Sequence, residues 1–181
     1  GTTVTGASSV LDLNGHTLGT TEALTLSGAL AAGALQNTSS TDVSYNGQIV
    51  LGAASTIIAN YGDINITATG NITGNTFGLT IGGVGNGTLS SNLNTTTGTL
   101  AKNGAGLWTI SGGASTFTGA TTISAGTLKL GSAGSGSNTP LGTSAGGISI
   151  TSGAIFDLNG FTLATAEALA INGTGIANIG A

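Results

Sequence analysis

The chain has 181 residues and a net charge of −4, and Gly alone accounts for 34 of them. Only 4% of the residues are charged and Cys is absent, so the sequence lacks the basic patch of a nucleic-acid-binding protein and the thiolates of a disulfide or zinc site. Hydrophobic residues still make up 39% of the chain, which predicts a folded protein rather than a disordered one.

A segment of 17 residues occurs twice, first at 12–28 (DLNGHTLGTTEALTLSG) and again at 157–173 (DLNGFTLATAEALAING). The copies are 145 positions apart and share 11 of 17 residues. We therefore expect residues 1–181 to form a single β-solenoid segment with a super-repeat of about 145 residues, whose second copy starts near residue 146. Because the chain opens with Gly1 rather than Met, it is also expected to be a piece of a longer repetitive protein.

A shorter pattern runs along the whole chain, in which two apolar residues flank one intervening residue. Alternation over three residues is typical of a short strand, and Asn-Gly or Ser-Gly pairs behind several of them predict turns. Gly, Thr and Asn are poor helix formers, so almost no helix is expected. In chain order the pairs are Leu11/Leu13, Leu24/Leu26, Ile49/Leu51, Ile64/Ile66, Leu79/Ile81, Trp108/Ile110, Leu128/Leu130, Ile148/Ile150, Phe156/Leu158 and Leu169/Ile171.

Short strands at these spacings are compatible with a sandwich, a barrel or a solenoid. Aromatic residues make up only 4% of the chain, which disfavours a sandwich built on aromatic anchors. Gly, Asn and Ser suit the tight corners of small coils. The prediction is therefore an all-β, right-handed parallel β-helix of roughly seven to nine coils, each of about 20 to 25 residues. The stretch 131–147, which contains Pro140, is expected to be a loop that leaves the coil.

The ionisable residues are too few and too scattered to predict a catalytic or metal site. The acids are Asp12, Glu22, Asp42, Asp63, Asp157 and Glu167, and four of these six are copies within the repeat, which indicates a turn or solubilising role. His16 is replaced by Phe161 in the second copy, so a ligand role is disfavoured. No catalytic residue and no cofactor is predicted, and the chain is not expected to be an enzyme.

Three other features are candidate contact or binding sites. The segment 82–89 is similar to a calcium-binding nonapeptide, but Gly87 stands where the acidic ligand is needed, so no metal is predicted. Trp108 is expected to point into the core because of its spacing from Ile110. Tyr45 and Tyr61 adjoin turn glycines and are the weak candidates for contact with a partner, whereas surface packing is the favoured interpretation of both.

Residues 98–131 read GTLAKNGAGLWTISGGASTFTGATTISAGTLKLG, and this segment resembles the autotransporter-associated β-strand repeat, also called the passenger-associated transport repeat. The resemblance rests on Lys102 within the Gly-rich opening, on Trp108 before Ser111-Gly112, on Phe117 before Thr118-Gly119 and on the Gly-Thr-Leu close. It implies a long extracellular β-helix of a bacterial surface protein, secreted through an outer-membrane β-barrel elsewhere in the same parent chain. It transfers no catalytic residue.

The expected function is structural: a stalk, fibre or coat segment at the bacterial cell surface or outside the cell. Exposed strand edges at the two ends predict self-association, end to end or laterally, and filaments are a possible product. The alternative is an adhesin that binds a glycan or a host protein. A polysaccharide lyase or hydrolase ranks third, because the chain has almost no bases.

Overall fold

The computed structural model describes residues 1–6, 8–18, 21–28 and 34–173, and within these ranges it consists of short strands and turns without a helix. None of this described chain therefore offers a helix able to cross a membrane. The strands are β1 (Thr2–Thr5), β2 (Leu11–Asp12), β3 (Leu24–Ser27), β4 (Leu35–Asn37), β5 (Val43–Tyr45), β6 (Ile49–Leu51), β7 (Ser55–Ala59), β8 (Ile64–Ile66), β9 (Asn71–Thr73), β10 (Leu79–Gly83), β11 (Gly87–Leu89), β12 (Asn92–Asn94), β13 (Leu100–Lys102), β14 (Leu107–Ile110), β15 (Thr121–Ile123), β16 (Thr127–Leu130), β17 (Ile148–Ile150), β18 (Ile155–Asp157) and β19 (Leu169–Ile171).

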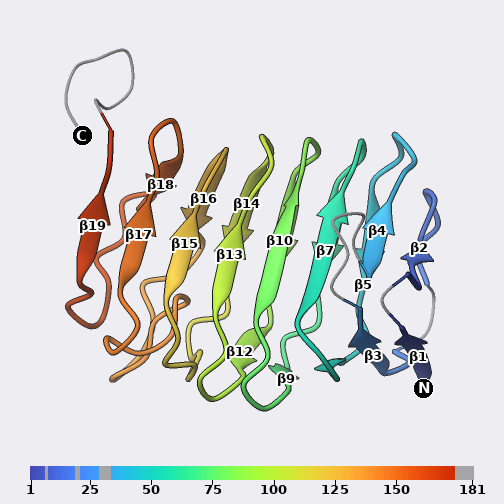
Figure 1. Ribbon diagram of the computed structural model, residues 1–181, viewed down its shortest axis with the longest axis horizontal. Coiled ribbons are helices and arrows are strands. Elements are labelled where there is room, and N and C mark those ends of the chain that lie inside the picture. The colour runs from blue at the N-terminus through green and yellow to red at the C-terminus, as the bar shows by residue number, and fades with distance from the viewer. Residues whose placement is uncertain (7, 19–20, 29–33, 174–181) are drawn as a thin grey trace.

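The strands form three parallel sheets that run along one axis. Sheet A has the order β1-β3-β6-β9-β12, sheet B the order β19-β17-β15-β13-β10-β7-β4-β2, and sheet C the order β18-β16-β14-β11-β8-β5. Successive strands in the chain belong to different sheets (Figure 1). From β3 to β14 each coil passes from sheet A to sheet B to sheet C. Among the described residues, the first coil has strands in sheets A and B only, and from β15 to β19 the strands alternate between sheets B and C. The predicted parallel β-helix is confirmed, with about seven coils, at the lower end of the expected range.

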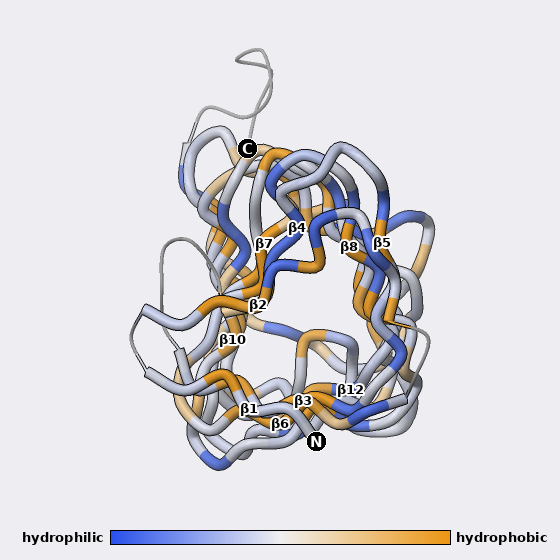
Figure 2. The backbone as a smooth tube through the Cα atoms, turned by 90° about the vertical axis from the view of Figure 1, so that its right-hand side faces the viewer, coloured by the Kyte–Doolittle hydropathy of each residue, from blue (hydrophilic) through white to orange (hydrophobic). Residues whose placement is uncertain are grey.

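The coils wind in the right-handed sense. In Figure 2, which looks along the axis from the N-terminal end, the chain goes from β3 to β4 to β5 and back to β6, clockwise as it recedes from the viewer. Right-handed crossovers are the general rule for parallel strands of one sheet, because a twisted strand packs back onto the sheet only that way.

The core lies inside the coils and consists of ranks of side chains stacked from coil to coil. One rank of sheet B runs through paired inward positions: Leu11, Leu35, Ile57, Ile81, Lys102, Ile123, Ile150 and Ile171. Apart from the lysine, every member is aliphatic. Each fully buried Leu or Ile contributes roughly 1.5 to 3 kcal/mol, so stability accumulates with each added coil interface.

All ten predicted apolar pairs lie in or directly beside strands, and seven have both members buried. The other three pairs lie in the first or last coils, where the described part of the chain places no neighbouring coil on one side of a side chain such as Leu158, Leu169 or Ile171. The intervening residues, among them Thr80, face outward as predicted. Nine strands were not predicted. In most of them Gly, Ser, Thr, Asn or Lys fills an inward or flanking position, but β5 carries the inward apolar pair Val43/Tyr45.

The predicted loop at 131–147 is present as an enlargement of one coil. Leu107 pairs with Thr127, a spacing of 20 residues, whereas Thr127 pairs with Ile155, a spacing of 28. The extra residues form isolated antiparallel bridges, Ser135 with Asn138 and Thr139 with Gly142. The chain re-enters the stack at Thr139, which is 0% exposed, so the middle of the predicted loop, from Thr139 to Gly142, is buried.

The two copies of the 17-residue repeat form the same turn on different sheets. Asn14 and Gly15 both have positive φ, as do Asn159 and Gly160, so each pair forms a type I′ turn. The first copy runs from β2 in sheet B to β3 in sheet A, whereas the second runs from β18 in sheet C to β19 in sheet B. The repeat is therefore a local turn-and-strand unit that is independent of the sheet it joins. Positions 19–20 of the first copy lie outside the described residues.

Candidate functional site

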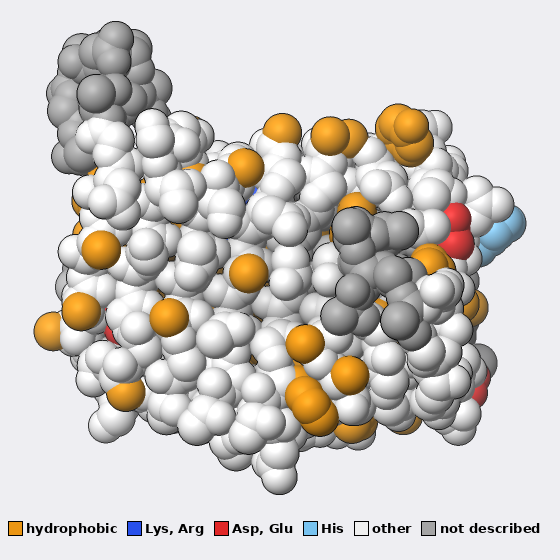
Figure 3. All heavy atoms as spheres, in the orientation of Figure 1, with side chains coloured by type: hydrophobic (Ala, Val, Ile, Leu, Met, Phe, Trp, Pro, Cys, Tyr) orange, Lys and Arg blue, Asp and Glu red, His pale blue; other side chains and the backbone are white. Residues whose placement is uncertain are grey.

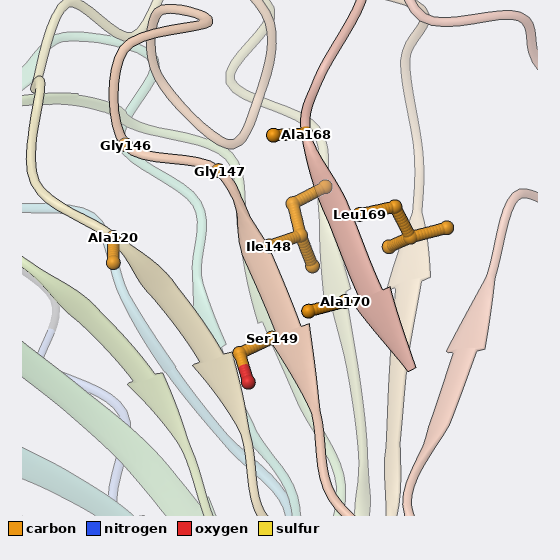
Figure 4. Close-up of a pocket in the computed structure, with 8 residues that line it drawn as sticks. All are labelled: Ala120, Gly146, Gly147, Ile148, Ser149, Ala168, Leu169 and Ala170. Atoms are coloured by element: carbon orange, nitrogen blue, oxygen red, sulfur yellow. The ribbon is translucent and has the colours of Figure 1, made fainter. Parts of the chain in front are cut away.

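The described residues bring no three His, Asp or Glu side chains together in a way that could hold a metal ion. Their single ion pair joins the N-terminal amine to Glu22 at 3.6 Å. A shallow cavity of about 280 Å³ lies near the start of β17 and β19 (Figure 4). Its lining carries no ionisable group and consists of Ala120, Gly146, Gly147, Ile148, Ser149, Ala168, Leu169 and Ala170.

The repeated aspartates act within their turns. The Oδ1 atom of Asp12 accepts the backbone N–H of Asn14 at 2.9 Å, and that of Asp157 accepts the N–H of Asn159 at 2.7 Å. Burial by itself would raise the pKa of Asp12, but hydrogen bonds from Thr38 and from the Asn14 N–H outweigh it and hold this pKa below its ordinary value. The hydrogen-bonded carboxylate of Asp12 therefore stabilises the folded state at neutral pH. This stabilisation is lost as the pH falls through the lowered pKa of Asp12, because the carboxyl group is then protonated.

The structure separates the two tyrosines that the sequence offered as contact residues. Tyr45 is 1% exposed, its ring points into the core, and its hydroxyl donates to the carbonyl oxygen of Glu22. It is therefore not available to a partner on the surface. Tyr61 is 70% exposed, the highest value among the large hydrophobic side chains described. A period-two pattern would have distinguished them, since Tyr45 is spaced from Val43 as an inward pair.

Tyr61 stands on the corner between sheet B and sheet C, which we call the B–C corner. At this corner a column of glycines stacks from coil to coil: Gly62, Gly85, Gly106 and Gly126. A Cβ atom on Gly85 would lie 2.8 Å from the carbonyl oxygen of Gly62, and one on Gly106 would lie 1.9 Å from that of Gly85. Only glycine lets the coils approach this closely. The residue before each glycine forms an outward ridge, the B–C ridge: Tyr61, Val84, Ala105 and Ala125.

Asp63 follows Gly62 and Asn86 follows Gly85, and together these two residues form a second row. Asp42, one coil earlier, begins this row. Each side chain accepts a backbone N–H from the next coil: Asp42 Oδ1 from Asp63, Asp63 Oδ1 from Asn86, and Asn86 Oδ1 from Leu107, each at 2.9 Å. We call Asp42, Asp63 and Asn86 the Asx row. The row uses one oxygen of each side chain to hold the coils together.

One of the two lysines lies inside the B–C corner. Lys102 is 0% exposed, and its Nζ donates to the carbonyl oxygens of Asn103 at 2.7 Å, Gly104 at 2.8 Å and Ala125 at 3.0 Å. No carboxylate accompanies it among the described residues. Burial lowers the pKa of Lys102 to about 8. Sequence reasoning missed this, because Lys102 shares its strand with Leu100 at the spacing of an inward pair but is itself charged.

Trp108 is buried, as predicted, and it explains Gly87. The two residues pair directly between β14 and β11, and a Cβ atom on Gly87 would lie 2.7 Å from the indole ring. The indole Nε1 donates to the carbonyl oxygen of Gly82 at 3.2 Å. Gly87 of the calcium-like segment 82–89 thus leaves room for the indole ring of Trp108, because it has no side chain.

Lys102 and Trp108 lie within residues 100–130, and Gly87 packs against this segment. Residues 100–130 match the passenger-associated transport repeat. No curated protein and no solved structure matches the chain. The match confirms the resemblance predicted for residues 98–131.

In this fold the passenger-associated transport repeat covers β13, β14, β15 and β16, which belong to two successive coils. Its lysine fills the B–C corner from inside, and its tryptophan fills the interior beside sheet C. Its Phe117 is 1% exposed. The residues on either side of Phe117 bond to Leu93 of β12 and to Thr96, so Phe117 lies one coil beyond β12, the last strand of sheet A. Through Lys102, Trp108 and Phe117 the repeat therefore supplies interior packing, whereas its Lys129 faces outward from β16.

Proposed function

We propose that this chain is a structural spacer within a repetitive bacterial protein, in which the coils set the length of a stalk, fibre or coat. The observation that supports it most is the unbroken stacking of inward residues from Leu11 to Ile171, coil upon coil. Such a stack transmits position along its axis and gains stability with each interface. The proposal assigns no catalytic residue to the chain.

The passenger-associated transport repeat suggests a surface or secreted location for the parent protein. The chemistry of the chain agrees with that location. Its exterior is built of Thr, Ser and Asn with few charges, and it has no thiol that an oxidising environment would modify. We infer that the segment serves outside the cell, carried by a longer chain.

A coil deletion tests the spacer function. Removing residues 55–78 takes out one coil, because Leu79 pairs with Ser55 and Ile81 with Ile57 in the neighbouring coil. β10 can then pair with β4, and the rod should shorten by about 4.8 Å while remaining folded. Small-angle X-ray scattering measures the length, and Trp108 fluorescence reports the folded interior.

The matched control removes residues 55–66, about half a coil. This deletion places the inward residues of β9 against the wrong sheet, so the variant should lose cooperative unfolding and the emission of a buried Trp108. If the whole-coil deletion behaves no better than the half-coil deletion, the coils are not interchangeable units and the spacer proposal is wrong.

A second function has one specific observation in its favour. Tyr61 and Val84 are large hydrophobic side chains that the fold leaves on the surface, away from the two ends of the rod. Contiguous exposed apolar groups with polar residues at their rim mark interaction sites more often than scattered ones do. We propose adhesion as this alternative function.

A further inference from the structure

The two most exposed large hydrophobic side chains described are neighbours. Tyr61 is 70% and Val84 is 65% exposed. The other exposed large hydrophobic residues belong to the first two or last two coils: Val10, Leu18, Leu158, Leu169 and Ile171. Ala59 pairs with Gly83 in the next coil. Val84, which follows Gly83, therefore lies on the same corner as Asn60 and Tyr61, one coil further along the axis. Figure 3 shows a row of hydrophobic side chains along the upper edge of the molecule, over the turns that follow β7, β10 and β13.

The B–C ridge is held rigidly. The N–H of Gly62 donates to Ser39 at 2.7 Å, that of Gly85 to Ala59 at 2.9 Å, and that of Gly106 to Gly83 at 3.0 Å. Lys102 ties the inner side of the same corner with its three hydrogen bonds. A ligand that contacts the B–C ridge therefore orders little of the protein, which lowers the entropic cost of binding.

Polar groups run beside the ridge in the same sequence of coils. In the Asx row each Oδ1 is used by the fold, but Asp42 Oδ2, Asp63 Oδ2 and Asn86 Nδ2 have no hydrogen-bond partner among the described residues. Asp42 and Asn86 are exposed, and Asp63 is half-buried. The corner thus combines an apolar edge with two acceptors and one donor, spaced from coil to coil by about 4.8 Å.

Charge narrows the class of ligand. Neither lysine is on this surface, since Lys102 is buried and Lys129 faces outward from β16 on sheet C. The carboxylates of Asp42 and Asp63 repel an anionic polymer at close range. A ligand with an apolar face, many hydroxyls and no negative charge fits both the ring of Tyr61 and the free atoms of the Asx row. A sugar ring presents these groups together.

We propose that the B–C ridge and the Asx row form a binding site for a neutral polysaccharide, with sugar rings stacked on Tyr61 and Val84 and their hydroxyls bonded to the Asx row. This inference rests on the adhesion function proposed above. It is independent of the spacer function, which the coil deletion tests separately.

The experiment is affinity electrophoresis of the 181-residue chain through gels that contain one polysaccharide each. Hydroxyethylcellulose, xylan, mannan and dextran are the neutral probes, polygalacturonate is the anionic probe and chitosan is the cationic probe. The variants are Tyr61→Ala, Tyr61→Phe and Val84→Ser. Thr122→Ala, on the outer face of β15 in sheet B, is the matched control. Trp108 fluorescence confirms that each variant is folded.

We expect retardation by at least one neutral probe and none by polygalacturonate. Tyr61→Ala should weaken binding at least tenfold, Val84→Ser several-fold, and Tyr61→Phe less than threefold, because the ring is kept; Thr122→Ala should bind as the unmodified chain does. Retardation by no neutral probe overturns the proposal, and so does binding that survives Tyr61→Ala. Retardation by chitosan alone shows that the acidic row binds cations instead, which also overturns it.

Discussion

At the scale of single residues, Lys102 is the least expected feature of the interior. It occupies a rank of Leu and Ile side chains, and three carbonyl oxygens take the place of a counter-ion. Carbonyls of two successive coils accept from it, Gly104 from one and Ala125 from the next. A buried ammonium without a carboxylate is costly even when hydrogen-bonded, and the lowered pKa expresses that cost.

The pKa of Lys102 predicts a pH dependence of stability. The folded state releases the proton near pH 8, whereas the unfolded chain holds it until about pH 10.5, so the unfolded state binds more protons between these values. The free energy of unfolding should therefore rise with pH, by about 1.5 kcal/mol between pH 8 and pH 9.5. Urea unfolding followed by Trp108 fluorescence measures it.

Lys102→Met is the control, since it keeps the length of the side chain and removes the titration. Its unfolding free energy should not rise over the same range. The series stops at pH 9.5 because the pKa of Tyr45, raised by burial and by the charge of Glu22, favours the unfolded state once the pH exceeds 10. A rise of equal size in the methionine variant would show that another group is responsible.

Gly87 and Trp108 form the clearest pair of complementary sizes. Gly87→Ala should lower the free energy of unfolding by about 1 to 3 kcal/mol, because the new methyl group meets the indole at a distance that no relaxed structure allows. Circular dichroism during denaturation measures the loss. In the background of Trp108→Leu the same substitution should cost less than half as much, and equal costs in both backgrounds would mean that the ring is not the cause.

At the scale of elements, the repeated turn shows how a short motif can be reused on different sheets. Gly15 and Gly160 have nearly the same φ, +79° and +75°, and both follow an Asn with positive φ. Their surroundings differ. A Cβ atom on Gly15 would lie 2.7 Å from the Oγ of Ser39, whereas one on Gly160 would meet nothing within 4 Å.

The two glycines therefore separate backbone strain from crowding. Gly160→Ala should lower the free energy needed to open its turn by about 1 kcal/mol, which is the cost of a left-handed backbone for a residue with a Cβ. Gly15→Ala should cost clearly more, because crowding is added. Hydrogen exchange of the His16 and Phe161 amides, which donate to Leu13 and Leu158 at 2.8 Å in each turn, measures the two openings. If both substitutions lower the opening free energy equally, the side chain of Ser39 moves aside without a measurable loss of stability.

The predicted strands carry two apolar residues at inward spacing, and most of the missed strands do not; β5, with Val43 and Tyr45 inward, was overlooked. β10 carries Leu79 and Ile81 and was found, whereas β13 carries Leu100 and Lys102 and was not. β11 was missed because its inward Gly87 gives up its volume to a side chain of the next coil. A pattern along the chain cannot register such a trade between coils.

At the scale of the whole molecule, the two ends of sheet B carry β2 and β19, which within the described ranges pair on one side only. Leu169 and Ile171 of β19 are 50% and 47% exposed. Parallel strands with open edges and apolar side chains favour pairing with another chain. For the 181-residue chain this predicts self-association that grows with concentration.

The double variant Leu169→Lys with Ile171→Lys should lower that association at least fivefold, because charges on an edge strand oppose pairing. Thr122→Lys adds a charge inside sheet B without touching its edge, and it should leave association unchanged. Sedimentation velocity over a range of concentrations measures both. If the edge variant associates as strongly as the unmodified chain, contact occurs elsewhere on the rod.

The sequence by itself determined the all-β class, the coiled architecture, the inward pairs such as Leu24 and Leu26, the turn at Asn14-Gly15 and the transport repeat, because each depends on residues close together in the chain. Tertiary structure alone decided that Lys102 is an interior residue, that Tyr45 is buried while Tyr61 stands beside Val84, and that the repeat copies lie on different sheets. These features depend on which residues the coil spacing brings together. That spacing varies from 20 to 28 residues with every insertion at a corner, so it emerges only when the coils are stacked.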